Sequence, residues 1–266
     1  MAALPKAVNI SQYAFYNCSS LTSVSLPSAA IIGSSAFNRC YELYAIDLPQ
    51  ASIIYSYAFS DCRNLTSISI PKIQAIKGNA FANCYNLSQI ILPDTLTELG
   101  IGTFDGCSNL SSITIPSTIT KLGANCFSSC INLSNITFNG NISSIGECCF
   151  ANCAFSSIFM PYLTVLGNSA FCSCRSLTKA VFGKLSSCGY GVFGACENLE
   201  ELHLIEFNEQ NTHYLFTDNQ IKLSAIYVYG EKVPAACLNP NLRERISSCK
   251  LYVRNSMLPY YNLDDS

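Results

Sequence analysis

The chain has 266 residues, of which only 12% are charged, and its formal net charge is −2. Its 15 Lys and Arg residues are scattered, so they cannot form the clustered basic surface that nucleic acid requires. No apolar stretch approaches the roughly 18 residues that span a bilayer, and the N-terminus lacks a signal-peptide pattern. We therefore expect neither nucleic-acid binding nor membrane insertion.

One pattern repeats along residues 1–204. A phenylalanine recurs every 21–23 residues, and a cysteine follows it three positions later. An aliphatic residue precedes most of these phenylalanines by five positions, as Ile54 precedes Phe59. A unit this small cannot bury a core alone, so the repeat predicts a solenoid of stacked units. The nine phenylalanines are Phe15, Phe37, Phe59, Phe81, Phe104, Phe127, Phe150, Phe171 and Phe193.

Each unit predicts two short elements in chain order. Phe59, Cys62 and Leu65 are spaced by three, which suits a tight helical turn with one apolar face. The alternation Ile68-Ser69-Ile70 that follows suits a short strand with one buried side, and the proline after it closes the strand.

The motif LTSISIP followed by IxGxxAFxxCxxL resembles the BspA-type leucine-rich repeat, over about residues 4–204. Such repeats occur in surface proteins of bacteria and some parasitic protists, and in phage-encoded proteins. The resemblance implies a leucine-rich-repeat solenoid, a right-handed β-rich coil with a concave parallel sheet and short helical turns on the convex side. It also implies binding or adhesion at a cell surface or in a secreted protein, with no enzymatic activity and no cofactor.

The two ends of the chain depart from the repeat. Residues 205–266 predict a degenerate repeat, opened by Phe216, and a C-terminal cap. Within the cap, LSAIYVYG (223–230) and KLYVRNS (250–256) suit strands, and NPNLRERI suits a short helix with Asn239 as its cap. At the other end no capping segment precedes the first unit, so we expect further repeats or a partner to cover it.

The sixteen cysteines could be packing residues, disulfide partners or metal ligands. The nine repeat cysteines are 21–23 residues apart, whereas a zinc site needs pairs two to four residues apart. Packing as small buried hydrophobes needs only an inward position, so we predict that these nine are reduced and buried. The disulfide to consider first is Cys126–Cys149, because adjacent coils are close enough to bridge.

Catalysis is not expected. A Cys–His pair needs an exposed thiol beside His203 or His213, and the repeat thiols are predicted to be buried. Carboxylates are too few and too scattered along the repeats for a two-carboxylate site.

The candidate binding site is an outward column on the concave face. Phe159, Val181 and His203 occupy the same register of consecutive units, flanked by Lys179 and Glu201, with Tyr227 next in line. An exposed apolar and aromatic patch with a charged rim is a plausible surface for a protein or glycan ligand. The alternative is that the C-terminal cap folds over the patch and buries it.

These observations predict a non-enzymatic binding module that recognises protein or glycan, as part of a cell-surface or virion-displayed adhesin. An intracellular, cytoplasmic protein-interaction scaffold is the alternative, favoured by free thiols and the missing signal peptide. A passive spacer without a ligand is the third reading.

Overall fold

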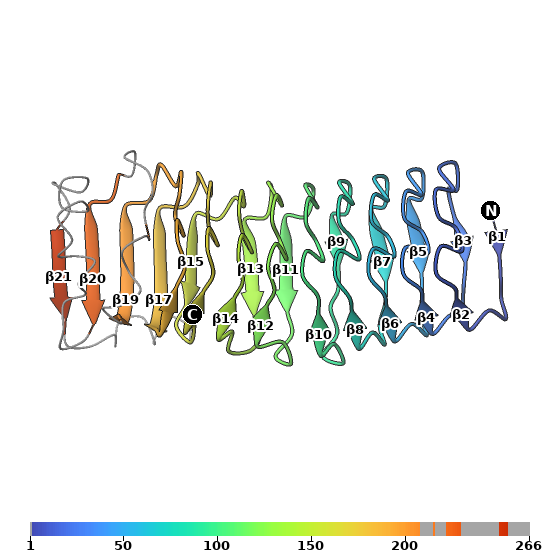
Figure 1. Cartoon of the computed structure of the whole chain (residues 1–266), viewed down its shortest axis with the longest axis horizontal. Coiled ribbons are helices and arrows are strands. Elements are labelled where there is room, and N and C mark those ends of the chain that lie inside the picture. The colour runs from blue at the N-terminus through green and yellow to red at the C-terminus, as the bar shows by residue number, and fades with distance from the viewer. Residues whose placement is uncertain (1, 208–214, 216–221, 230–249, 255–266) are drawn as a thin grey trace.

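The computed structural model describes residues 2–207, 215, 222–229 and 250–254. In this part of the chain, successive coils follow one another along a single long axis (Figure 1). Every strand pairing is parallel and joins equivalent strands of neighbouring coils, and the pairings divide the strands into six sheets. The predicted parallel-sheet solenoid is confirmed.

The strands predicted from the Ile-x-Ile alternation form one row, here called the front row. In β7, Ile68 is buried whereas Ser67 and Ser69 on either side are exposed, as a half-buried strand requires. The front row consists of β1 (Ala2–Ala3), β3 (Val24–Ser25), β5 (Ala45–Asp47), β7 (Ser67–Ser69), β9 (Gln89–Ile90), β11 (Ser112–Ile115), β13 (Asn135–Phe138), β15 (Ser157–Met160), β17 (Lys179–Leu185), β19 (Glu201–Phe207), β20 (Ala225–Tyr229) and β21 (Lys250–Arg254).

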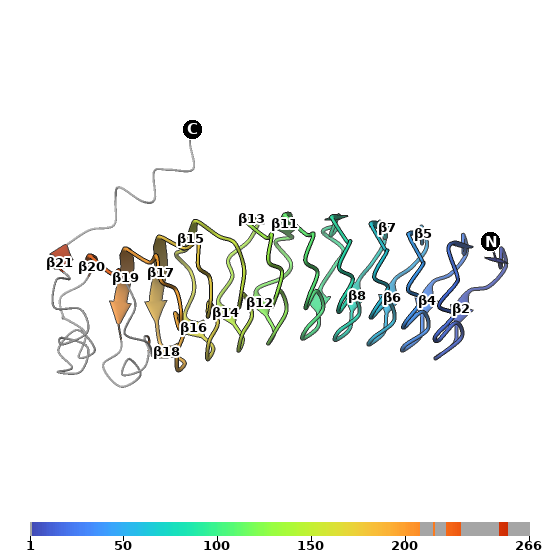
Figure 2. The same ribbon diagram turned by 90° about the horizontal axis from the view of Figure 1, so that it is seen from above.

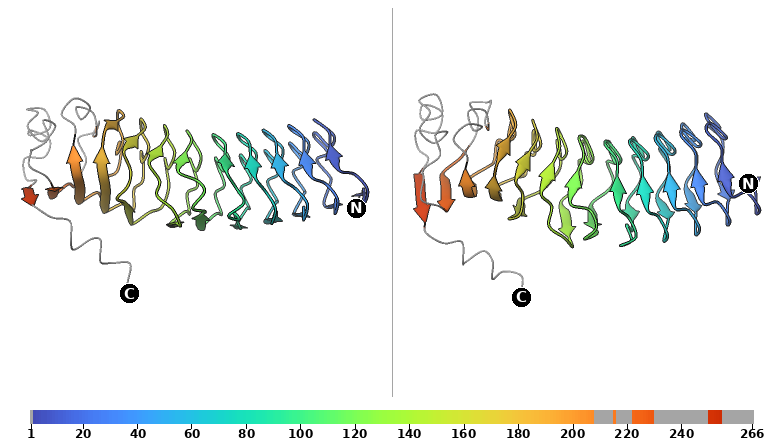
Figure 3. Two further views of the ribbon diagram at one scale, coloured as in Figure 1. Left: turned by 90° about the horizontal axis from the view of Figure 1, so that it is seen from below. Right: turned by 60° about the horizontal axis from the view of Figure 1, so that its bottom comes forward.

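A second row of two-residue strands, the rear row, contains the aliphatic residue that precedes each phenylalanine. Sequence reasoning recognised this residue as apolar but assigned no strand to it. Figures 2 and 3 show the rear row set apart from the front row along the stack. It consists of β2 (Asn9–Ile10), β4 (Ile31–Ile32), β6 (Ile53–Ile54), β8 (Ala75–Ile76), β10 (Glu98–Leu99), β12 (Lys121–Leu122), β14 (Ser144–Ile145), β16 (Val165–Leu166) and β18 (Ser187–Cys188).

The segment around each phenylalanine is a series of turns, so the predicted short helical turns are wrong. No helix occurs among the described residues. The Ser60 amide donates to the Tyr57 carbonyl of its own coil, whereas the Phe59 and Asp61 amides donate to carbonyls of the next coil. A helix would use all of these amides within itself. Here alternate amides join neighbouring coils instead.

Left-handed backbone shapes this turn. Residues two positions before and two positions after the phenylalanine have positive φ, as at Asn79 (57°) and Asn83 (59°) around Phe81. Around Phe104 both positions are glycine, Gly102 and Gly106. Asn and Gly tolerate this conformation better than other residues do, because most side chains clash with the backbone there.

The phenylalanines form a continuous stack through the core. Neighbouring rings are nearly parallel, with centroids from 4.9 Å apart for Phe15–Phe37 to 5.9 Å for Phe171–Phe193. Each ring is therefore covered by the coils on both sides. This is the packing that a single unit could not supply.

The repeat cysteines hydrogen-bond as well as pack. From Cys40 to Cys196, each thiol donates to the carbonyl of the phenylalanine one coil earlier, at 3.0–3.2 Å. These eight cysteines are buried and free, as predicted. Cys18 is free but exposed, so the prediction of burial is wrong there. The reason is that no described coil lies on the side of Cys18 that would receive its thiol. Cys126 and Cys149 are also free thiols.

The C-terminal strands continue the front row. β20 lies within the predicted strand 223–230 and β21 within 250–256, and both pair into the same sheet as β15, β17 and β19. The predicted cap helix with Asn239, and the positions of Phe216 and His213, lie outside the described residues.

Candidate functional site

The four central residues of the predicted patch lie side by side in the front row. The strand register pairs Phe159 with Val181, Val181 with His203, and His203 with Tyr227. Their exposure differs from the prediction, however. Phe159 is 39% exposed, whereas Val181 is 3% and His203 1% exposed. The expected exposed stripe is therefore wrong at its centre, and only Phe159 remains as a large exposed residue of the three.

Tyrosines of β20 account for the burial of His203. The His203 ring stacks on Tyr227 with centroids 4.3 Å apart, and its Nδ1 lies 3.0 Å from the Tyr229 hydroxyl. Val181 packs with Tyr229 and Tyr227 in a small cluster separate from the main core. The C-terminal strands thus cover this part of the patch, which was the alternative considered from the sequence.

The predicted charged rim is an internal network. The Glu201 carboxylate lies 3.1 Å from His203 Nε2 and 3.1 Å from Lys179 Nζ. The hydrogen bond from His203, and then the one from Lys179, holds the pKa of Glu201 below its ordinary value. These groups satisfy one another, so they offer a ligand less charge than their sequence suggests.

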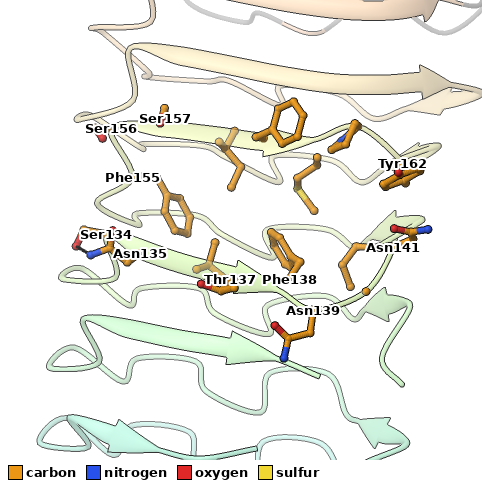
Figure 4. A pocket seen from close by; sticks show the side chains of 17 residues that line it. Ser134, Asn135, Thr137, Phe138, Asn139, Asn141, Phe155, Ser156, Ser157 and Tyr162 are labelled. Atoms are coloured by element: carbon orange, nitrogen blue, oxygen red, sulfur yellow. Dashed lines mark hydrogen bonds between the residues drawn. The ribbon is translucent and has the colours of Figure 1, made fainter. Parts of the chain in front are cut away.

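A cleft opens in the front row between β13 and β15 (Figure 4). Its volume is about 650 Å³, within the range of ligand-binding pockets, and its walls are residues 134–142 and 155–162. Figure 1 shows β13 and β15 farther apart than the paired strands on either side of them. The structure thus places an open site directly beside Phe159.

A shortened link in the repeat accompanies this cleft. Ile68 follows Cys62 by six positions, but Ile158 follows Cys153 by only five. Phe155 is buried in the shortened link and packs edge-on against Phe150, with centroids 5.4 Å apart. The connection from Cys153 to β15 is thus one residue shorter than the equivalent connection from Cys62 to β7. Among the described strands, β15 pairs with β17 alone.

The two strands that flank the cleft each have one open edge. β13 pairs with β11 and β15 pairs with β17, each over four residues, but β13 and β15 do not pair with each other. In two other coils the equivalent amide crosses to the next coil: Leu4 N–H donates to the Ser25 carbonyl at 3.0 Å, and Leu48 N–H donates to the Ser69 carbonyl at 2.9 Å. Within the described residues, Phe138 N–H makes no such bond to β15.

The walls of the cleft carry no charged side chain. Ile136 and Phe138 are half-buried on its inner side, whereas Phe159 and Tyr162 are exposed at its opening. Amides and hydroxyls complete the rim, including those of Asn135, Thr137, Asn139, Asn141 and Ser157 (Figure 4).

Sequence reasoning found only Phe159 of this cleft. Two signals were present in the chain: the 21-residue spacing from Phe150 to Phe171, and Asn139 at a position where earlier units carry proline, as at Pro116. Neither signal indicates a separation of strands by itself.

The buried thiols have little nucleophilic character. Burial raises the pKa of Cys40, Cys130 and Cys196 to about 12, because a thiolate would lose its hydration. In the part of the chain that the structure describes, no cluster of three or more His, Cys, Asp and Glu side chains is arranged to hold a metal ion. The described residues also contain no helix with the length and apolar character that crossing a membrane requires.

A family profile for the BspA type leucine-rich repeat region matches residues 3–110 and 97–222, in six copies. No protein with curated annotation matches the chain.

Three solved structures resemble this one. A leucine-rich repeat protein of T. pallidum is 32% identical over 56% of this chain and 74% of its own, with a TM-score of 0.53. A leucine-rich repeat protein of Bacteroides ovatus is 20% identical over 95% of this chain and 91% of its own, with a TM-score of 0.53. A leucine-rich cell surface protein of Faecalibacterium prausnitzii is 21% identical over 98% of this chain and 89% of its own, with a TM-score of 0.50.

Proposed function

Since this chain belongs to the BspA type leucine-rich repeat family, we propose that it is a non-enzymatic protein-binding module whose contact surface is the cleft between β13 and β15. The observation that carries this proposal is the cleft itself, an uncharged opening of about 650 Å³ between two front-row strands that do not pair with each other.

Two aromatic side chains support recognition of a protein. Phe159 and Tyr162 are exposed at the opening of the cleft. Leaving large aromatic rings in water adds little to folding, whereas such rings are the residues that anchor protein interfaces. A folded partner would bury them, together with half-buried Phe138 behind them.

The setting we propose is an adhesin displayed at a cell surface. The resemblance to the Faecalibacterium prausnitzii cell surface protein supports this setting. An intracellular scaffold is the second candidate, because all fourteen cysteines that the structure describes are free thiols, which suits a reducing compartment. Antibody labelling of intact and permeabilised source cells separates the two. Labelling only after permeabilisation would reject the adhesin.

The contact surface is tested with a pair of matched variants. Phe159→Ser removes the aromatic ring at the cleft, and Ile91→Ser removes an 83% exposed side chain from the equivalent position of another coil. Both variants and the parent chain are assayed for binding to a panel of extracellular-matrix and cell-surface proteins, and to an array of purified glycans.

We expect the parent and Ile91→Ser to bind the same protein target, and Phe159→Ser to bind it at least tenfold more weakly. Circular dichroism of each variant controls for folding. Equal binding by all three chains would show that the contact surface lies elsewhere. Binding to glycans alone would reject a protein ligand.

A further inference from the structure

We propose that the cleft between β13 and β15 receives an extended, uncharged segment of a partner protein, which pairs its backbone with both open strand edges. This inference rests on the proposed protein-binding function and specifies how the partner is held. The segment would act as an additional strand within the front row.

The pairing of β13 with β11 fixes the direction of the backbone groups in β13. In a parallel ladder, alternate residues direct their N–H and C=O groups to opposite neighbours. In β13 the Asn139 amide donates to Ile115 in the preceding coil. The amides of Ile136 and Phe138 therefore face β15, where the described residues provide no partner.

The opposite wall presents a complementary edge. In β15 the Ser156 carbonyl accepts from the Thr178 amide of the next coil, so the N–H and C=O groups of Ser157 and Phe159 face β13. The Ala154 amide, in the shortened link, donates to the Leu133 carbonyl of the preceding coil. Each wall of the cleft thus offers donors and acceptors at strand spacing. This arrangement is what an extended peptide needs for pairing on both sides.

The side chains of the walls define which peptide fits. Alternate residues of an inserted strand would point inward and outward. Inward residues would meet Ile136 and Phe138, and outward residues would lie between Thr137 and Phe159. Apolar residues at every second position therefore fit the inner side. A charged inward residue would be buried without a counter-charge, because the walls contain none.

These features favour a peptide over a glycan. A sugar could stack on Phe159 or Tyr162 and hydrogen-bond to the asparagines of the rim. It would not match two facing rows of backbone donors and acceptors, which repeat at the spacing of a peptide.

The open edges can be checked in the full chain without any ligand. Native-state hydrogen exchange should show faster exchange at the Ile136 and Phe138 amides than at Ile113 and Ile115, their equivalents in β11. At least a tenfold difference is expected. Equal protection at the two pairs would mean that β13 and β15 are joined in solution, and would overturn the proposal.

The occupant is tested by selecting random nine-residue linear peptides on the full chain. We expect the selected peptides to be uncharged, with β-branched or aromatic residues at alternate positions, and to slow exchange at Ile136 and Phe138. Methylating every second backbone nitrogen of a selected peptide should weaken its binding at least tenfold whether the odd or the even residues are methylated, because the two sets of amides pair with opposite walls.

Matched variants locate the binding. Thr137→Arg places a bulky charge in the cleft, and Ser69→Arg places the same side chain at the equivalent register of β7. Peptide binding should be lost in the first and kept in the second.

Failure to recover any peptide, tolerance of methylation at either set of alternate nitrogens, or equal binding by the two variants would overturn strand insertion. A protein partner that still depends on Phe159 would then leave the proposed function standing. If no peptide inserts and no protein partner depends on Phe159, both proposals are rejected.

Discussion

At the scale of single residues, the repeated cysteine combines packing with a hydrogen bond. The thiol of Cys84 donates to the Phe59 carbonyl, which also accepts the Cys62 amide. Burial of the thiol could be predicted from its spacing. The hydrogen bond could not, because it depends on which backbone carbonyls turn inward.

Replacing one of these thiols should therefore lower the free energy of unfolding by more than the small size of the thiol suggests. We expect Cys84→Ala to lower the free energy of unfolding by about 2 kcal/mol, since it removes a buried atom and leaves a carbonyl with one bond fewer. Cys18→Ala at the exposed position should change it by less than about 0.5 kcal/mol. Urea denaturation measures both, and equal costs would contradict the role assigned to the thiol.

Thiol reactivity should separate the buried repeat cysteines from the exposed Cys18. Because burial raises the pKa of Cys40, Cys130 and Cys196 to about 12, these thiols should react with a thiol reagent only after unfolding. Cys18 should react at once in the native protein. Mass spectrometry after brief labelling identifies the modified residues. Rapid native labelling of the core cysteines would refute their burial.

Glu201 should make stability depend on pH. Its pKa is lowered in the folded state, from an ordinary value of 4.5, chiefly by the hydrogen bond from His203. The stabilisation is therefore complete above about pH 4.5 and is lost as the pH falls through the folded-state pKa. The difference in unfolding free energy between the parent and Glu201→Gln should shrink over that range.

The expected difference at neutral pH is at most about 1 kcal/mol, because the carboxylate is partly exposed and screened by solvent. Glu197→Gln, which removes a carboxylate 3.9 Å from Arg175 at an exposed site, controls for the loss of one charge. A pH-independent difference for Glu201→Gln would contradict the role of its ionised form.

At the scale of elements, patterns of alternation were better guides than patterns of spacing. The strand around Ile68 was predictable because every second residue is apolar over several positions. The rear strands contain only two residues each, too few to show alternation. The three-residue spacing of Phe59, Cys62 and Leu65 suggested a helix. The actual turn has the same spacing because its amides bond three residues back at alternate positions.

A column of glycines after the rear strands allows close approach of neighbouring coils. A Cβ on Gly167 would lie 2.4 Å from the Gly146 carbonyl carbon, a contact that only backbone movement could relieve. We expect Gly167→Ala to reduce the free energy of unfolding by about 2 kcal/mol. Lys77→Ala, at the same register of a coil that accommodates a side chain, should cost less than about 0.5 kcal/mol. Thermal denaturation compares them, and similar losses would argue against a backbone clash.

At the scale of the whole molecule, the repeat predicted the stack of coils but not the cleft between β13 and β15. Each unit specifies its own elements, and stacking follows because every unit has two open faces. The cleft depends on two adjacent units together: a shortened link after Cys153 and the preceding strand β13. The burial of His203 is likewise decided by Tyr229, a residue of another strand. Properties that depend on several units cannot be read from the template of one.

The cleft also has a mechanical consequence. The front row is divided at β13 and β15, but the rear row continues past it through β12, β14, β16 and β18. The rings of Phe127, Phe150 and Phe171 likewise stay stacked across it. At this boundary the two coils are therefore separated in the front row and joined in the rear row, so the rod should be able to bend there, with the stacked rings as the hinge. A peptide strand bound in the cleft would join β13 to β15 and stiffen the rod at this boundary. Binding at one site would thereby reduce the bending of the whole molecule.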